Sequence, residues 1–234
     1  MDVVILAGGK GSRLGYLTKS IPKPMVKIGN KPIIWHLMKI FASQGHKNFI
    51  VCLGYKGNVL KQYFSKIKED WNIKCIDTGQ ETLTAKRLYK IKKYISSKKF
   101  FMTYGDGLAD ISLKSLYKIH CKTKKIATVT AVSPLPRFGS LIIKKDIVVN
   151  FREKNKDNKN LINGGFFVLD KQIFKTLDLN KNVMWEMEPM ASLTKKNQLS
   201  AYKHKGFWHP MDTDRDRDLL NKLYKVSPFW KTWK

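Results

Sequence analysis

Short apolar runs alternate with longer segments of helical periodicity, and this alternation restricts the fold of the chain more than any other feature. Runs rich in Val, Ile and Phe occupy positions 3–6, 49–53, 73–76, 100–104 and 127–132, with amphipathic segments between them. Strands that alternate with helices are typical of a mostly parallel sheet covered on both faces. We therefore expect an α/β fold with a Rossmann-like, mostly parallel mixed sheet and helices on both faces.

The pattern changes after Pro134, where strand-like pieces at 141–143, 147–151 and 164–169 are separated by turn residues. No repeat or linker interrupts the 234 residues, so we expect a single domain over 1–234. It would comprise a first half (1–133), a second half (134–213) that crosses the open edge of the first, and a C-terminal helix with an aromatic tail (214–234). We expect the tail to dock on the body, because exposed Trp is costly.

The charge of the chain is strongly basic, at +27 from 45 Lys and Arg against 18 Asp and Glu. The lysines recur singly or in pairs along the whole sequence rather than forming one basic arm, which is typical of solvated helix and strand faces. We therefore expect no nucleic-acid partner. A general positive field would still attract polyanionic phosphate compounds.

The three cysteines, Cys52, Cys75 and Cys121, are odd in number and far apart, so neither a disulfide framework nor a zinc site is indicated. No segment reaches 18 uninterrupted apolar residues, and Met1 leads directly into an apolar run. We expect buried thiols, no membrane span, no signal peptide and a cytoplasmic location.

A glycine-rich segment follows the first predicted strand: Gly8, Gly9 and Gly11 precede Ser12 and Arg13. Glycines there let the backbone turn its N–H groups towards phosphate oxygens, and Arg13 can add a charged contact. Three glycines alone are equally consistent with an ordinary turn. The next motif, Pro22-Lys23-Pro24, strengthens the functional interpretation, because flanking prolines stiffen the backbone that carries the Lys23 ammonium.

Two aspartates are candidate metal ligands. Asp106 lies between Gly105 and Gly107 at the end of a predicted strand, where open α/β sheets bind ligands, and Asp212 precedes the last predicted helix. Both have structural alternatives, since an Asp in a glycine turn is more often structural and Asp212 could belong to a helix N-cap region. Mg²⁺ commonly takes one or two carboxylates plus substrate phosphates, which this pair would meet.

Residues 6–14 (LAGGKGSRL) followed by 22–25 (PKPM) resemble the signature of the sugar-1-phosphate nucleotidyltransferases. The resemblance continues at 103–107 (TYGDG), 163–167 (NGGFF), 185–186 (WE), 206–213 (GFWHPMDT) and 230–233 (WKTW), and within that family it is greatest to the cytidylyltransferases that act on glucose 1-phosphate. It implies Mg²⁺-dependent transfer of a nucleotidyl group from CTP to a sugar 1-phosphate, here α-D-glucose 1-phosphate, for deoxysugar or surface-polysaccharide synthesis. It also implies a homo-oligomer.

The resemblance assigns a role to each matching residue. Residues 1–133 would bind the nucleotide and 134–213 the sugar phosphate. Arg13 and Lys23 would be catalytic and Asp106 and Asp212 would hold the metal. The nucleotide would be bound by Leu6, Ala7, Gly8, Gly9, Gly11, Ser12, Arg13, Lys23, Thr84, Arg87 and Gly105, and the sugar phosphate by Glu153, Lys154, Asn163, Gly164 and Gly165.

The sequence departs from the family pattern at three places. Ala85 and Lys86 stand where the base-binding segment has two glycines, and Asn155 stands where a proline usually follows Glu153-Lys154. The connection from Phe64 to Asp77 is short where the family carries a longer insertion associated with subunit contacts, so the oligomeric state stays open. A Lys86 side chain turned into the pocket would favour a carbonyl and hence UTP or dTTP. The alternatives that stay open are another sugar 1-phosphate or nucleotide, a non-catalytic binder, and a nucleic-acid-binding protein.

Overall fold

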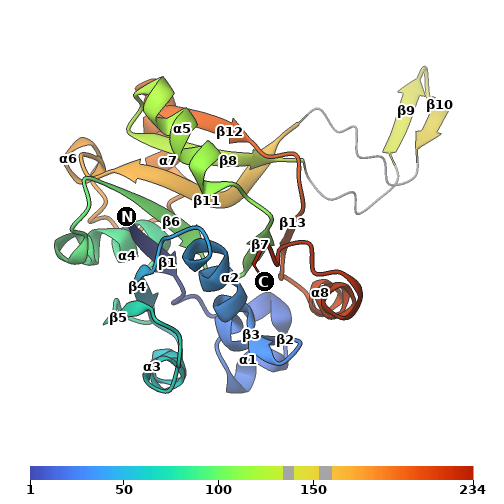
Figure 1. Cartoon of the computed structure of the whole chain (residues 1–234). Coiled ribbons are helices and arrows are strands. Elements are labelled where there is room, and N and C mark those ends of the chain that lie inside the picture. The colour runs from blue at the N-terminus through green and yellow to red at the C-terminus, as the bar shows by residue number, and fades with distance from the viewer. Residues whose placement is uncertain (134–139, 153–159, 234) are drawn as a thin grey trace.

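The computed structural model describes residues 1–133, 140–152 and 160–233, and a seven-stranded sheet lies at its centre (Figure 1). Its strand order is β12-β8-β11-β6-β1-β4-β5. Strand β11 is antiparallel to both of its neighbours, and every other pair in this sheet is parallel. The predicted mostly parallel mixed sheet is therefore confirmed.

The strands are β1 (Asp2–Leu6), β2 (Lys27–Ile28), β3 (Lys31–Pro32), β4 (Asn48–Leu53), β5 (Asn72–Asp77), β6 (Lys99–Tyr104), β7 (Gly107–Ala109), β8 (Ala127–Val132), β9 (Ser140–Lys144), β10 (Ile147–Arg152), β11 (Ile162–Asp170), β12 (Leu199–Lys203) and β13 (Trp208–Pro210). The α-helices are α1 (Leu17–Ser20), α2 (Ile33–Ala42), α3 (Gly57–Ser65), α4 (Thr84–Lys90), α5 (Leu113–Thr123), α6 (Ile173–Thr176), α7 (Glu188–Lys195) and α8 (Asp214–Val226). Three 3-10 helices, η1 (Ser12–Leu14), η2 (Lys23–Met25) and η3 (Lys92–Tyr94), complete the set.

The inner strands of the sheet are buried on both faces, which explains why β1, β4, β6 and β11 contain long apolar runs. In β1, Val3 and Ile5 pack into the core shared with α2, α3, α5 and α8, whereas Val4 and Leu6 pack into the core shared with α4, α6 and α7. Side chains alternate between the faces of a strand, so a strand covered on both sides needs apolar residues at every position. The expected helices on both faces are thus confirmed.

Strand β11 corrects one expectation of the sequence analysis. The second half of the chain was expected to cross the open edge of the first, but β11 lies inside the sheet and pairs with β6 on one side and β8 on the other. Phe166, Phe167, Val168 and Leu169 are all essentially inaccessible to solvent. A run that is apolar on both faces would expose half of its side chains at an uncovered position, so the interior of the sheet is its favourable place.

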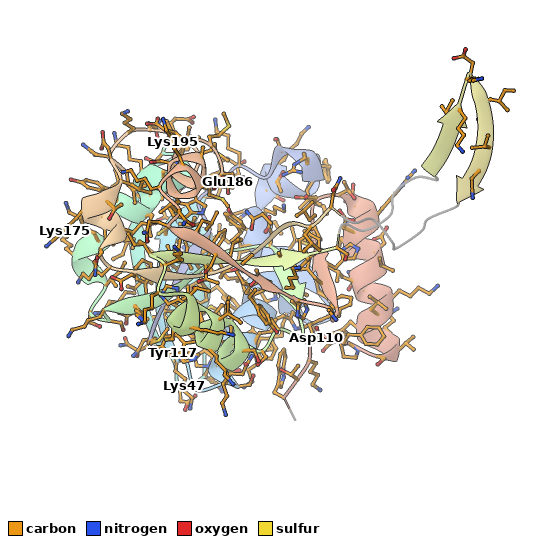
Figure 2. The ribbon with its side chains drawn as sticks, turned by 90° about the horizontal axis from the view of Figure 1, so that it is seen from above. Lys47, Asp110, Tyr117, Lys175, Glu186 and Lys195 are labelled. Carbon is orange, nitrogen blue, oxygen red and sulfur yellow. The ribbon has the colours of Figure 1, made fainter. Side chains whose placement is uncertain are left out.

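Two peripheral ladders complete the arrangement. Strands β7 and β13 form a short antiparallel pair near the end of β6, and β9 and β10 form a hairpin that projects away from the rest of the molecule in both views (Figures 1 and 2). The aromatic tail docks as expected: Trp230 is fully buried against His36 of α2, and Trp233 lies edge-on to Trp35.

Candidate active site

A cavity of about 530 Å³ opens where β1 and β6 end at their carboxyl termini and β11 begins. Because β1 and β6 are parallel and β11 is antiparallel to them, the ends of two strands and the start of the third meet at one edge of the sheet. This edge is where open α/β sheets bind their ligands. Of the residues predicted for the site, Leu6, Ala7, Gly8, Gly9, Gly11, Arg13, Lys23, Thr84, Arg87, Gly105, Asp106, Asn163, Gly164, Gly165 and Asp212 line this cavity.

Among the described residues, the predicted Ser12 does not line the cavity. It belongs to the same glycine-rich loop and is exposed. Glu153 and Lys154 lie outside the described residues.

The glycine-rich loop is shaped by close contacts that leave no room for side chains. A Cβ at Gly11 would lie 2.7 Å from Cβ of Lys23, and Gly11 has a left-handed φ of 65°. A Cβ at Gly8 would lie 2.2 Å from Nη1 of Arg87. The absence of a side chain at Gly8 thus lets Arg87 approach the loop, and Gly11 lets the backbone turn over Lys23.

Lys23 joins the two predicted metal ligands. Its Nζ lies 2.6 Å from Oδ2 of Asp106 and 2.8 Å from Oδ1 of Asp212, and Arg13 Nη1 donates to the other oxygen of Asp212 at 3.1 Å. Burial by itself would lower the pKa of Lys23, but the two carboxylates more than offset this effect and raise that pKa above its ordinary value. All four charged groups predicted from the sequence are therefore brought together at one point.

The ladder between β7 and β13 explains how Asp106 and Asp212 meet. Gly107 pairs with Pro210, and the Met211 N–H donates to the Asp106 carbonyl at 2.9 Å. This pairing holds the residue before β7 close to the residues that follow β13. The Asp106 side chain contacts Lys23 rather than only shaping its own turn.

Asp212 is not the cap of the last helix. Thr213 is the N-cap of α8 and forms a capping box with Asp216, which also accepts the Asp212 N–H at 3.0 Å. The cap is therefore made by the following residues, and it leaves the Asp212 side chain directed towards Lys23 and Arg13.

Arg87 lines the cavity, yet its guanidinium is occupied by the protein itself. It donates to the backbone carbonyls of Gly8, Leu53, Gly79 and Gln80 at 2.8–3.2 Å and to Thr78 Oγ1 at 2.6 Å. Only 3% of this residue is exposed. These contacts fix the glycine loop against β4 and the segment after β5, so Arg87 positions the loop.

The two residues that replace glycines in the family pattern do not line the cavity. Ala85 is fully buried in the core shared with α4, and neither Ala85 nor Lys86 lines the cavity. Thr84, which opens α4, does line it, and its Oγ1 accepts the Trp185 N–H at 2.6 Å. Lys86 is half-buried and contributes no donor to the lining of this wall.

Glu186 is a cavity residue that the analysis of single motifs did not select, although it belongs to the WE pair within the resemblance. It is exposed and lines the cavity, accepts a hydrogen bond from the Tyr104 hydroxyl, and lies 3.4 Å from Thr84 Oγ1. Figure 2 labels its position in the segment before α7. Burial and the nearby Glu186 carboxylate raise the pKa of Tyr104, which keeps its phenol protonated as a donor. Among the described residues, no basic side chain forms an ion pair with Glu186, although Lys and Arg far outnumber Asp and Glu in this chain.

Asn163 and the glycines after it form the opposite wall. Asn163 Oδ1 accepts the Gly165 N–H at 2.8 Å, and its Nδ2 lies 3.4 Å from the Tyr104 hydroxyl. Gly165 has a φ of 80°, and a Cβ there would lie 2.9 Å from the Tyr104 ring. Glu186, Tyr104 and Asn163 therefore form one chain of polar contacts along the cavity lining.

The site can hold a hard cation through Asp106 and Asp212. Their oxygens already converge on one positive charge, the Lys23 ammonium, and carboxylate oxygen is the donor type that hard divalent ions prefer. No cluster of three or more His, Cys, Asp or Glu occurs within the part of the chain that the structure describes, so further ligands would come from the substrate or from water.

Comparison with known proteins identifies the family. The Nucleotidyl transferase family matches residues 2–222. The chain belongs to this family. The glycine loop, Lys23 and both aspartates all lie within the matched range.

This nucleotidyl transferase has relatives of similar length. It is 42% identical over 257 residues to the glucose-1-phosphate cytidylyltransferase of Salmonella typhimurium and 39% identical over 255 residues to the probable glucose-1-phosphate cytidylyltransferase of Bacillus subtilis, with 100% of each chain covered. The first alignment spans 257 positions against 234 residues here, so that relative carries residues that this chain lacks.

A solved structure supports the fold of this nucleotidyl transferase. HddC from Yersinia pseudotuberculosis is 27% identical, superposes with a TM-score of 0.74, and matches 95% of this chain and 99% of its own length. HddC has also been solved in complex with GMP-PN.

Proposed function

We propose that this chain transfers the cytidylyl group of CTP to the phosphate of α-D-glucose 1-phosphate, giving CDP-glucose and pyrophosphate. The observation that carries the proposal is the meeting of Arg13, Lys23, Asp106 and Asp212 beside a glycine loop in one cavity. Full-length identity of 42% to a glucose-1-phosphate cytidylyltransferase supports the choice of substrates. The product would serve deoxysugar or surface-polysaccharide synthesis, including O-antigen.

The chemistry requires positioning and charge neutralisation. An oxygen of the sugar phosphate attacks the α-phosphorus of CTP in line, a new P–O bond forms, and the bond to the departing pyrophosphate breaks. Because the attacking oxygen is already anionic, no general base is needed. The loop at Gly8, Gly9 and Gly11 binds phosphate oxygens through its N–H groups, while Arg13 and Lys23 stabilise the charge that develops.

We propose Mg²⁺ as the metal, with Asp106 and Asp212 as its protein ligands. When bound, Mg²⁺ would supply further neutralisation of phosphate charge. The test is removal of the metal with a chelator: activity should vanish, return with Mg²⁺, and return less fully in Asp106→Asn and Asp212→Asn. If both variants respond to Mg²⁺ as the wild type does, the metal is held elsewhere.

The nucleotide assignment is tested by offering CTP, UTP, dTTP, ATP and GTP with glucose 1-phosphate and measuring pyrophosphate release. CTP should be used fastest, because the cavity offers the Glu186 carboxylate as an acceptor and Lys86 is not among the residues that line it. Faster turnover with UTP or dTTP would overturn the cytidylyl assignment and keep the reaction class. A second candidate is the same chemistry on another sugar 1-phosphate, which a panel of hexose and heptose 1-phosphates would reveal.

Two other functional classes are a non-catalytic binder and a nucleic-acid-binding protein. A non-catalytic binder would be expected to lack one of the four charged groups, and all four are present. A nucleic-acid-binding protein would show steep salt dependence in binding, which a titration would reveal.

We further propose a homo-oligomer in the cytoplasm. The β9–β10 hairpin supports self-association, because Ile143, Ile147, Val148 and Val149 are each 49–67% exposed. Measurement of molar mass in solution tests this assignment, and a monomer would overturn it. No helix of the described residues is long and apolar enough to span a membrane.

A further inference from the structure

Lys23 occupies an unusual position for a group whose expected partner is a phosphate. Its side chain is 10% exposed and its ammonium is bonded to both Asp106 and Asp212, whose side chains are 27% and 18% exposed. Pro22 and Pro24 restrict the backbone on either side, and Gly11 packs against the stem of the lysine. The stem is therefore fixed, and only the end of the side chain can exchange partners.

This group brings opposite charges into direct contact. Among the described residues, Asp106 and Asp212 contribute two negative charges, and Lys23 and Arg13 contribute two positive charges. Without the ammonium, two carboxylates facing the same point would repel each other. A divalent cation that arrived alone would add two positive charges beside the ammonium and the guanidinium.

Nucleotide phosphates change this balance. The same cavity holds the glycine loop, so a triphosphate bound there would offer anionic oxygens to Lys23 and Arg13. The ammonium would then have a new partner within reach of its fixed stem, and both carboxylates would be released.

We propose that Lys23 is a positioning residue for the metal site: its ammonium holds Asp106 and Asp212 together as a place-holder and yields them only when nucleotide phosphates accept it. The proposal rests on the assignment of these aspartates as metal ligands under the proposed function. Metal and nucleotide then bind as a coupled pair, and each strengthens the affinity of the other by the same factor. Free metal by itself binds weakly.

The test is the affinity for Mn²⁺ alone, with no nucleotide and no turnover, measured by calorimetry or by the electron paramagnetic resonance of free Mn²⁺. Lys23→Met keeps the length of the side chain and removes its charge, so it should bind Mn²⁺ at least about fivefold more tightly than the wild type, the lower end of usual coupling between ligands. Adding Asp106→Asn to Lys23→Met should abolish the gain.

The matched control is Lys39→Met. Lys39 is also a partly buried lysine in an ion pair, with Nζ 2.9 Å from Glu69 Oε2, but it lies on α2 and does not line the cavity. This variant should bind Mn²⁺ as the wild type does. Circular dichroism and the melting temperature with and without Mn²⁺ establish that each variant is folded, and Lys23→Gln replaces Lys23→Met if the latter is not.

Unchanged or weaker Mn²⁺ binding by the folded Lys23 variants would overturn the proposal, because a merely structural ion pair would lower stability without exposing a cation site. The result does not depend on which nucleotide or sugar the enzyme uses. If the wild-type enzyme turns over CTP and glucose 1-phosphate but the Lys23 variants show no gain in Mn²⁺ affinity, the place-holder role is rejected and the proposed function is kept.

Discussion

The contacts that single side chains make at the cavity are not evident from the residues beside them in the sequence. Lys23 is stiffened by two prolines, which is visible locally, but its partners Asp106 and Asp212 lie 83 and 189 residues away. Arg87 shows the reverse case: a residue predicted to bind nucleotide directs its donors to backbone carbonyls and the Thr78 hydroxyl.

At this scale we expect Lys23→Ala to reduce turnover about a hundredfold or more, by analogy with the loss of other preorganised charge-stabilising groups. The measurement is pyrophosphate release with CTP and glucose 1-phosphate, alongside circular dichroism to show that the fold is intact. Near wild-type release by a folded variant would remove Lys23 from the catalytic mechanism.

Glu186 carries a second prediction at the residue scale. Its carboxylate is held by Tyr104 and Thr84 and can only accept hydrogen bonds, so it suits the exocyclic amine of cytosine and disfavours the carbonyl of uracil. Glu186→Gln introduces donors and should reduce the ratio of kcat/KM for CTP to that for UTP by about tenfold. If KM rises only for the sugar phosphate, Glu186 contacts the sugar instead.

Elements bring the two aspartates into place. The β7–β13 ladder joins the residues around Asp106 to those before Asp212, and the capping box of α8 fixes the turn that follows. Asp216 accepts three hydrogen bonds, from the N–H groups of Asp212 and Thr213 and from the Thr213 hydroxyl. The start of α8 is thus also a support for the candidate metal ligand.

We therefore expect Asp216→Ala to lower the free energy of unfolding by about 1 kcal/mol, the usual cost of a lost cap, and to raise the Mg²⁺ concentration needed for half-maximal activity. Chemical denaturation and a Mg²⁺ titration measure the two effects. Asp218→Ala is the matched control. Asp218 is an exposed acid on the same helix, and among the described residues its carboxylate pairs only with Arg217. Equal behaviour of the two variants would contradict the supporting role of Asp216.

At the scale of the whole molecule, a buried histidine makes stability depend on pH. His120 of α5 is buried, with Nδ1 2.9 Å from Thr128 Oγ1 of β8. Burial, reinforced by the nearby Lys99 and opposed by Asp170, lowers the pKa of His120 from 6.5 to about 4. The unfolded chain therefore takes up a proton below pH 6.5 that the folded chain resists until about pH 4.

Stability should fall as the pH drops from 6.5 to 4, by about 1.4 kcal/mol for each unit of the shift, and this contribution should level off below pH 4. His120→Gln should remove that part of the slope while keeping a hydrogen-bonding side chain towards Thr128. The measurement is urea denaturation of both proteins between pH 4 and 7. His36 and His46, whose pKa values burial also lowers, should leave a smaller slope in the variant. Parallel curves for the two proteins would show that His120 does not contribute.

The sequence by itself determined the α/β class, the glycine loop, the stiff Lys23 and the place of Asp106 at a strand end. Each of these follows from hydrophobic periodicity or turn-forming residues within a short segment. Backbone preferences and the burial of a strand on both faces act on neighbouring residues. Only the tertiary structure decided that β11 lies inside the sheet and that Asp212 faces Lys23 while Thr213 caps the helix. It also decided that Glu186 lines the cavity and Lys86 does not. These outcomes depend on pairing and packing between segments far apart in the chain, where burial against distant partners decides which way a side chain points.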